Sequence, residues 1–363
     1  MGDQARNIAY GRIVILHFQH LKDHETLTKR HSKIIASCAL AIAFVTISTI
    51  GASIPSRATS ITPVAQLQSY LAAAIAQKSL PDVTKTVPTL TSLMSGQSSP
   101  IDLPTGQKFP VKPCYPFGVG SAVVKVSDVA SCAFGTTSSA KTVVLTGDSN
   151  AAMWLAPLKS LGEQLGFRVV FFGQAGCPPW RVDGSDDKIM YGTITVGSCD
   201  KVWNASVRSV VASIKPSLVI VSGFTGIPSD ASLFQTRLAA TVNGFKSAST
   251  KVLVLGPIPH SSFVHVVPGQ CLTSAKSNSA CILSTTTAVS KPFATAGPLV
   301  AASTKTTYVD VLSLFCVAQK CPMFVKTSSE NRLVYLDDAH MNRTYAAWIA
   351  PQLRQLLGSA LNL

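Results

Sequence analysis

The sequence has few charged residues, and acidic residues are the scarcest of them. Only 13% of its 363 residues are charged, against 47% that are hydrophobic, so one or two domains can bury a sizeable core. Lysine and arginine number 31 against 17 aspartates and glutamates, and the net charge is +14 at pH 7. The basic residues are scattered, without a run interleaved with aromatics, which disfavours nucleic-acid binding. The surplus fits either a basic face towards an anionic envelope polymer or lipid surface, or an ordinary soluble basic surface.

No charged residue occurs between Ile34 and Pro55. At ~1.5 Å rise per residue, a helix of this stretch can cross a hydrocarbon layer roughly 30 Å thick. Basic residues cluster before the stretch, from Lys29 to Lys33, and only Arg57 follows nearby. The positive-inside rule then places the N-terminus in the cytoplasm and the rest of the chain outside. We therefore expect a single-pass membrane protein, or a secreted one if the stretch is a cleaved signal peptide.

The sequence also lacks CxxC pairs and histidine-rich spacings, so we expect no zinc site and no other metal or cofactor. Of the nine cysteines, Cys38 lies inside the apolar stretch. The other eight form an even set, which predicts disulfides in an oxidising compartment. About a hundred pairings are possible, and the sequence alone leaves them open. The clustering suggests four bonds between close couples: Cys114–Cys132, Cys177–Cys199, Cys271–Cys281 and Cys316–Cys321.

Regular α/β patterning is predicted after residue 140. Five short apolar runs read as strands: Lys141–Thr146, Phe167–Phe172, Ser217–Ser222, Lys251–Gly256 and Thr307–Val311. Helical spacing covers 151–165, 202–214, 232–247, 284–302 and 345–357. Strands buried on both faces that alternate with helices indicate a parallel five-stranded sheet between two helical layers. Active sites in such sheets lie beyond the carboxyl ends of the strands.

The chain is predicted to have four parts. Residues 1–33 form a cytoplasmic tail and 34–55 the membrane anchor or signal segment. Residues 56–139, with a helix-like run followed by a stretch rich in Pro, Ser and Thr, form a linker or extension that wraps the domain. Residues 140–363 form the catalytic domain.

The motif Gly147-Asp148-Ser149-Asn150 follows the first predicted strand and opens a helix. Gly147 permits a tight turn. A serine at this place can be a nucleophile, because free backbone N–H groups at a helix N-terminus favour a developing oxyanion. The alternative is that Ser149 or Asp148 is simply the N-cap of the helix.

A serine nucleophile needs a general base, and the base needs a group that fixes its tautomer. Only three histidines follow the apolar stretch. His260 and His265 lie in a Pro-rich loop without a neighbouring carboxylate, and are interpreted as surface or loop residues. His340 ends Asp337-Asp338-Ala339-His340, where Asp337 can bend back to the imidazole and Asp338 is the alternative orienter. His340 is therefore the predicted base.

Two further patterns are assigned to structure. Trp154 and Trp203 lie on predicted helices and are expected in the core rather than at a substrate platform. Asn204 and Asn342 begin glycosylation sequons, which we discount because Asn342 abuts the candidate site.

The GDS motif after the first strand and the DxxH motif before the last helix resemble the SGNH/GDSL hydrolase superfamily. The stretches VVLTGDSNAAMWLAPL, AGCPPW and YLDDAHMN, with the cysteines around them, resemble the extracytoplasmic SGNH domain of acyltransferase-3 proteins, which O-acylate envelope glycans. The resemblance covers roughly residues 65–360. It implies a three-layer flavodoxin-like sandwich.

The same resemblance implies serine-dependent acyl transfer or ester hydrolysis. The reaction would O-acetylate or deacetylate a cell-envelope polysaccharide or glycolipid through an acyl-Ser149 intermediate. The alternative is a non-catalytic glycan-binding module or accessory subunit. Because this sequence has one apolar segment and no multi-span module, it is expected to act alone or with a separately encoded membrane acyltransferase-3 partner.

The sequence departs from the family pattern around the oxyanion hole. Family members usually read GDSH, and Asn150 stands here. The family's oxyanion glycine corresponds to Gly176, with Gly173 as the alternative. The family's third-block asparagine has no clear counterpart, so Ser222 or a backbone N–H is the expected replacement. Gly176, Gly173, Ser222 and Asn150 are thus the candidates for oxyanion or substrate contacts.

Overall fold

The structure, a computed structural model, describes residues 64–95, 113–116, 122–180, 190–191, 194–195, 199–226 and 229–363. The central sheet and the candidate site belong to one compact unit, Ile61–Met190 with Thr195–Leu363. The expected membrane segment 34–55 lies outside the described residues, and none of the helices described is long and apolar enough to cross a membrane.

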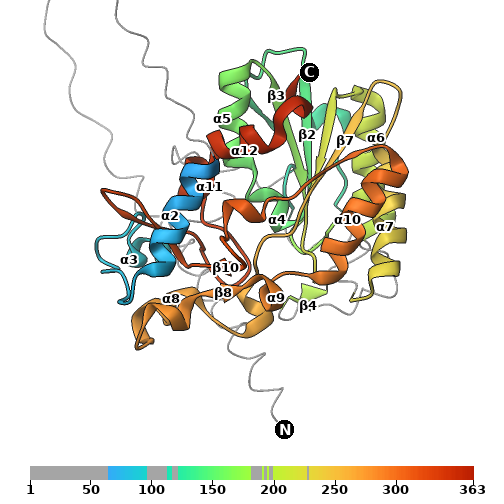
Figure 1. Ribbon diagram of the computed structural model, residues 1–363. Helices are drawn as coiled ribbons and strands as arrows, with labels where there is room; N and C mark the ends of the chain where they lie inside the picture. Colours follow the sequence, from blue (N-terminus) through green and yellow to red (C-terminus); the bar gives the residue numbers. More distant parts are fainter. Residues whose placement is uncertain are drawn as a thin grey trace, which may run out of the picture. The chain divides into compact units, whose positions relative to one another are not determined.

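A six-stranded sheet forms the centre of this unit, in the order β1-β3-β2-β6-β7-β9 (Figure 1). Its strands are β1 (Ala133–Gly135), β2 (Thr142–Gly147), β3 (Arg168–Gly173), β6 (Leu218–Val221), β7 (Lys251–Leu255) and β9 (Thr307–Val309). The last five are parallel, in the flavodoxin-like order second, first, third, fourth, fifth. Every residue of β2 and β6 is buried, as expected of strands covered on both faces.

The prediction of five parallel strands holds to within two residues at each strand end, but the sheet is mixed and has a sixth strand. β1 runs antiparallel to β3 at the sheet edge, and its residues lie in the segment 56–139 that was assigned to an extension. Three residues, Ala-Phe-Gly, carry no periodic signal. Pairing with the preformed edge of β3 is what makes this segment a strand.

Helices cover both faces of the sheet (Figure 1). One layer contains α5 (Leu155–Leu165), α11 (Arg343–Trp348) and α12 (Ala350–Leu357), and the other contains α6 (Ala205–Ile214), α7 (Ala231–Phe245) and α10 (Lys291–Thr304). In α5, Leu155, Leu158 and Leu161 recur every three residues and are buried. The opposite face of α5 carries the ion pair of Lys159 with Glu163. α5 thus turns one apolar stripe to the sheet.

Two predicted helices are each split in two. The helix expected over 345–357 breaks at Ile349, because Pro351 stands in the first turn of α12 and cannot continue α11. The helix expected over 284–302 becomes α9 (Thr285–Ala288) and α10, where Ser290 caps the N-terminus and a proline occupies the first turn. The start of the helix expected over 202–214 is a π-helix, Cys199–Asn204.

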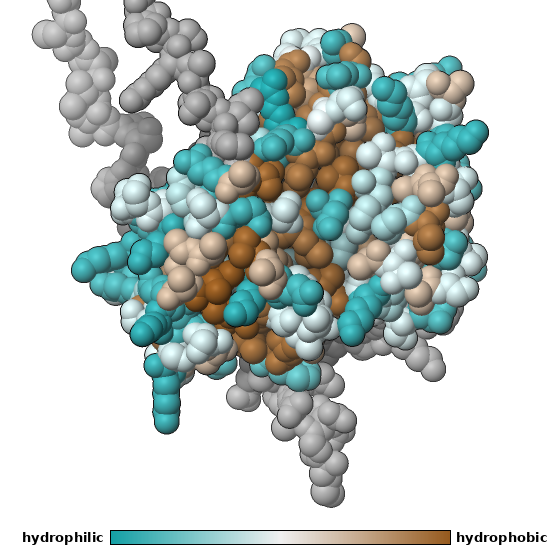
Figure 2. Space-filling view, in the orientation of Figure 1, coloured by the Kyte–Doolittle hydropathy of each residue, from teal (hydrophilic) through white to brown (hydrophobic). Residues whose placement is uncertain are grey.

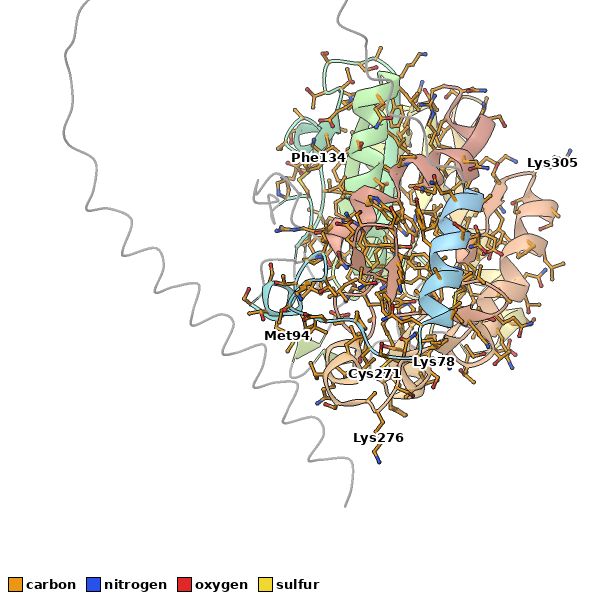
Figure 3. The ribbon with its side chains drawn as sticks, turned by 60° about the vertical axis from the view of Figure 1, so that its left-hand side comes forward. Lys78, Met94, Phe134, Cys271, Lys276 and Lys305 are labelled. Atoms are coloured by element: carbon orange, nitrogen blue, oxygen red, sulfur yellow. A yellow bond between two sulfur atoms is a disulfide. The ribbon has the colours of Figure 1, made fainter. Side chains whose placement is uncertain are left out.

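Smaller elements surround one end of the sheet. The helix α2 (Val64–Ala76) packs on β11 (Phe324–Lys326), which forms a hairpin with β12 (Asn331–Leu333). Its buried residues are Leu67, Leu71 and Ala74. The other short elements there are α3 (Leu90–Met94), α4 (Ser149–Ala152), α8 (Pro268–Ser274), β8 (Leu283–Ser284) and β10 (Lys320–Cys321). A two-stranded sheet of its own consists of β4 (Met190–Tyr191) and β5 (Ile194–Thr195). Met94, Cys271 and Lys276 lie together at this end of the unit (Figure 3).

All four suggested disulfides are formed: Cys114–Cys132, Cys177–Cys199, Cys271–Cys281 and Cys316–Cys321. Trp154 and Trp203 are fully buried, which confirms their assignment to the core. Figure 2 shows hydrophobic residues along the middle of one face, between α2 and α10, with hydrophilic residues on either side.

Candidate active site

Ser149, His340 and Asp337 form one continuous hydrogen-bonded chain at the carboxyl edge of the sheet. The Oγ of Ser149 lies 2.8 Å from Nε2 of His340. The Nδ1 of His340 lies 2.9 Å from each carboxylate oxygen of Asp337. An Nδ1–H that donates to the carboxylate leaves the lone pair of Nε2 to accept the serine proton. The structure therefore brings together the three residues that the sequence singled out.

The turn from β2 into α4 holds Ser149 at the surface of this edge. Gly147 has φ +148°, and a Cβ on it would lie 1.7 Å from the carbonyl oxygen of Ser222. Only glycine fits so close to the end of β6. Gln174 donates its backbone N–H to the Gly147 carbonyl and pins the turn from the other side. Ser149 is partly exposed although Asp148 and Asn150 on either side are buried.

Asp148, next to the serine, ties three segments together. Its carboxylate accepts the backbone N–H of Asn150 at 2.8 Å and that of Phe224 at 2.9 Å. It is thus the N-cap of α4, which was the alternative interpretation of this motif, and it also anchors the segment after β6. Burial raises the pKa of Asp148 to about 6, and the two N–H donors work against that rise.

The loop before α11 presents His340 from the opposite end of the sequence. Asp337 Oδ1 accepts the backbone N–H of Ala339 and of His340, which folds the loop into a tight turn. Met341 then donates its N–H to the sulfur of Met153, between α4 and α5. This contact docks the loop of residues 337–341, called the base loop below, directly on the segment that follows the serine.

Asn342 completes the loop and explains why its sequon is no glycosylation site. The residue is fully buried. Its side chain accepts the N–H of Tyr345 as the N-cap of α11 and donates to the Leu333 carbonyl. Asn204, the other sequon residue, is also buried, so neither side chain is accessible to modification.

The electrostatic interaction between Asp337 and His340 favours a charged carboxylate and a basic imidazole. Burial alone would lower the pKa of His340, but the charge and hydrogen bond of Asp337 raise it above its ordinary value. Burial likewise opposes ionisation of Asp337, yet His340 and two backbone N–H donors hold its pKa below the ordinary value. Asp337 is thus an ionised orienter for His340. Asp338 instead contacts the neighbouring loop, where its carbonyl accepts the N–H of Ser262.

The candidates for the oxyanion hole differ in what they can donate. Gly173 donates its backbone N–H to the Cys114 carbonyl, and Ser222 donates its N–H to the Thr146 carbonyl, so both groups are engaged. Gly176 lies in the turn after β3 with φ +69°. The backbone N–H of Ser149 donates no backbone hydrogen bond among the residues that the structure describes.

His260 differs from its sequence interpretation as a surface or loop residue. It lies in the loop before the 3-10 helix η3 (Ser261–Val264), but only 1% of it is exposed. Its ring stacks on Phe263 and meets the edge of Phe224, with 5.2 Å between the ring centroids in each pair. Burial lowers the pKa of His260 to about 3, so the ring is neutral at physiological pH. His265, five residues on, is exposed.

A serine hydrogen-bonded to an aspartate-held histidine, at the carboxyl edge of a flavodoxin-like sandwich, defines the class of serine esterases and acyltransferases with this fold. The family model of the SGNH domain that is fused to AT3 domains matches residues 114–355, and the chain belongs to this family. Among the residues described, no three His, Cys, Asp or Glu side chains are grouped so that they could hold a metal ion.

Several solved structures are similar to the chain. The periplasmic domain of a lipopolysaccharide acetyltransferase from Salmonella ser. Paratyphi A is 16% identical, with a TM-score of 0.48, over 78% of this chain and 97% of that one. TesA is 17% identical, with a TM-score of 0.34, over 61% and 100%. A mutant acetylxylan esterase from Geobacillus stearothermophilus is 13% identical, with a TM-score of 0.35, over 61% and 95%. No curated protein sequence matches the chain significantly.

Proposed function

We propose that this chain is an extracytoplasmic serine-dependent acyl-transfer enzyme that acts through an acyl-Ser149 intermediate. The observation that carries the proposal is the unbroken chain from Ser149 Oγ through His340 to Asp337, at 2.8 and 2.9 Å. A buried or capping serine needs no imidazole at hydrogen-bond distance. A nucleophile does, because a neutral hydroxyl is a weak nucleophile until a base removes its proton.

In the proposed reaction, His340 Nε2 takes the proton of Ser149 as Oγ attacks the ester carbonyl. The negative charge that develops on the carbonyl oxygen is stabilised by the N–H of Ser149 and by the turn that contains Gly176. Collapse of the tetrahedral intermediate breaks the ester C–O bond, and the imidazolium returns its proton to the departing alcohol. His340 then deprotonates a sugar hydroxyl or water, which attacks the acyl-serine and regenerates the free Ser149.

The proposed substrates are an acetyl or similar small acyl ester and a cell-envelope polysaccharide or glycolipid. Membership of a family whose members are fused to AT3 domains supports a membrane acyltransferase as the partner that supplies the acyl group. Four disulfides support an oxidising compartment outside the cytoplasm. The proposed location is therefore the outer side of the membrane, with residues 34–55 as the anchor or signal segment.

Labelling of the full chain in detergent with a fluorophosphonate, together with turnover of 4-nitrophenyl acetate, tests the proposal. We expect the wild type to be labelled and to release nitrophenol. Ser149→Ala and His340→Ala should each reduce turnover by at least about 10³-fold, and Ser149→Ala should abolish labelling. Ser209→Ala, which removes an exposed hydroxyl on α6, is the matched control and should behave as wild type. Labelling that persists in Ser149→Ala would refute the assignment.

A second candidate function is a glycan-binding or accessory subunit that retains the fold without turnover. The specific observation in its favour is that the N–H groups of Gly173 and Ser222 are engaged in backbone hydrogen bonds. Loss of one oxyanion donor can cost about 10²–10³ in rate. A folded wild type that binds envelope glycan, but shows neither labelling nor turnover, would favour this function over the first.

A further inference from the structure

Three aromatic rings gather beside the base loop. His260 and Phe263 stack at 24°, and Phe224 meets His260 at 75° and Phe263 at 55°. His260 is buried, whereas Phe224 and Phe263 are each partly exposed. A Cβ on Gly226 would lie 2.5 Å from the Phe224 ring, so glycine is needed there for the ring to hold this place. We call Phe224, His260 and Phe263 the aromatic wall.

The aromatic wall is attached to both sides of the candidate site. The backbone N–H of Phe224 donates to Asp148, directly before the nucleophile. Around the other two rings, Ser262 donates its N–H and Ser261 its hydroxyl to the carbonyl of Asp338, inside the base loop. Burial lowers the pKa of His260, and the charge of His340 lowers it further. The aromatic wall therefore borders the loop that carries His340.

The His340 side of the serine is the side on which the alcohol of an ester must lie. The imidazole returns its proton to the departing alcohol and later removes the proton of the attacking one, so both oxygens pass within hydrogen-bond reach of Nε2. The acyl group remains on Ser149 throughout. Groups that border the base therefore contact the alcohol part of the substrate and of the acceptor.

The aromatic wall also holds polar atoms that have no partner. The Nδ1 of His260 and the Oγ1 of neighbouring Thr225 are buried and make no hydrogen bond within the described part of the chain. Such atoms are unfavourable in an apolar cluster and are rare in folded proteins. A phenylalanine at position 260 would fill the space without this cost. The combination of ring faces and unpartnered polar atoms suits a ring that carries hydroxyl groups.

We propose that Phe224, His260 and Phe263 form the alcohol subsite, in which the ring of a sugar packs on the aromatic faces and a hydroxyl of that ring hydrogen-bonds to His260. The proposal rests on the proposed function and specifies which residues determine its leaving group and acceptor. Phe224 and Phe263 supply contact area, and His260 supplies the polar selectivity.

Ester series that vary one half of the substrate at a time test the subsite in the full chain. 4-Nitrophenyl acetate and vinyl acetate share the acetyl group and differ in the alcohol, whereas 4-nitrophenyl butyrate changes only the acyl group. In Phe263→Ala we expect kcat/KM for 4-nitrophenyl acetate to fall about fivefold to tenfold, the size of one lost aromatic contact. The value for vinyl acetate should stay within about twofold, and the acetate-to-butyrate ratio should not change. Val267→Ala, an exposed apolar residue nearby, is the control.

The variant His260→Phe tests the polar part, because it keeps a ring in the wall and removes the nitrogens. We expect acetyl transfer to methyl glucoside to fall severalfold relative to transfer to cyclohexylmethanol, with a melting temperature equal to or above that of the wild type. His265→Asn, an exposed histidine of the same loop, should change neither. An unaltered acceptor ratio in His260→Phe would overturn the role of His260.

Other outcomes separate the two proposals. A loss in Phe263→Ala that follows acyl length, or that is equal for both acetates, would refute the alcohol subsite while leaving acyl transfer intact. An unchanged kcat/KM for both acetates would do the same. Absence of Ser149-dependent turnover in the wild type would instead refute the proposed function itself.

Discussion

At the scale of single residues, the pH dependence of activity should be set by the negative charge of Asp337 beside His340. A general base works only while it is neutral, so activity should rise with pH through the pKa of His340. Asp337 raises that pKa above the ordinary histidine value of 6.5, although burial opposes the charged ring. The acid limb of the kcat/KM profile should therefore have its midpoint above pH 6.5.

The variant Asp337→Asn tests this argument. Removing the charge should lower the pKa of His340, so the acid limb moves to lower pH, and the plateau should fall about 10³–10⁴-fold because the tautomer is no longer fixed. The measurement is kcat/KM for 4-nitrophenyl acetate across about pH 5 to 8. Asp338→Asn is the matched control, and it should shift the limb in the same direction by less, since Asp338 contributes less to the pKa of His340. An acid limb that stays in place in Asp337→Asn would contradict the pairing.

The candidate triad was predictable from the sequence because few histidines are available and because the aspartate lies close to the histidine in the chain. His340 stands out because only three histidines follow the apolar stretch, and Asp337 lies within one turn of it. The burial of His260 could not be read in the same way. It results from Phe224 and Phe263 closing around the ring, and Phe224 comes from a different strand end. Pro-rich loops usually lie on the surface, and nothing local marks this histidine as an exception.

At the scale of elements, the base loop depends on the start of α11. Asn342 caps this helix two residues after His340 and also satisfies the carbonyl of Leu333, with both bonds buried. Asn342→Ala should lower the free energy of unfolding by about 2–3 kcal/mol, from the lost cap and the unpaired carbonyl. Urea denaturation of the full chain measures the change.

The same variant should slow fluorophosphonate labelling, because a frayed α11 no longer fixes His340 beside Ser149. Asn243→Ala on the exposed face of α7 should alter stability by less than about 0.5 kcal/mol and leave labelling unchanged. If Asn342→Ala retains wild-type stability and labelling, the helix cap does not position the base.

Strands that are buried on both faces, and helices whose apolar residues recur with helical spacing, were predictable from the sequence. The run Thr-Val-Val-Leu of β2 has no polar face and is fully buried, so its place in the central sheet followed from composition. The break at Ile349 could be placed only with the structure, because Pro351 is tolerated in a first turn and forbidden in an interior one. β1 was missed because its partner β3, not its own sequence, makes it a strand.

At the scale of the whole molecule, the four disulfides close short loops around the sheet and the site. Cys114–Cys132 spans 18 residues, and the Cys114 carbonyl accepts the N–H of Gly173 at the end of β3. Cross-linking a loop of this size stabilises a protein by about 3 kcal/mol. Replacing both cysteines by alanine should lower the free energy of unfolding by about this amount. Labelling should also slow, since the turn that contains Gly176 loses its support.

The pair Cys271–Cys281 provides the comparison. This disulfide closes a loop of 10 residues, so the loss of chain entropy in the unfolded state is similar. Cys271 lies at the end of the unit where Met94 and Lys276 also lie (Figure 3). Its double alanine variant should lose stability to a comparable extent and keep the labelling rate. Equal labelling losses in the two variants would show that the disulfides act only through global stability.

The separation of 191 residues between Ser149 and His340 has a consequence for biosynthesis. Ser149 leaves the ribosome 191 residues before His340, and α11 follows that histidine after two residues. Throughout that interval the emerging polypeptide carries a serine that nothing activates. Under the proposed mechanism, reactivity towards esters begins only after His340 has been made and the loop that carries it has docked on Met153. A nascent chain that ends before His340 is in this way kept chemically silent.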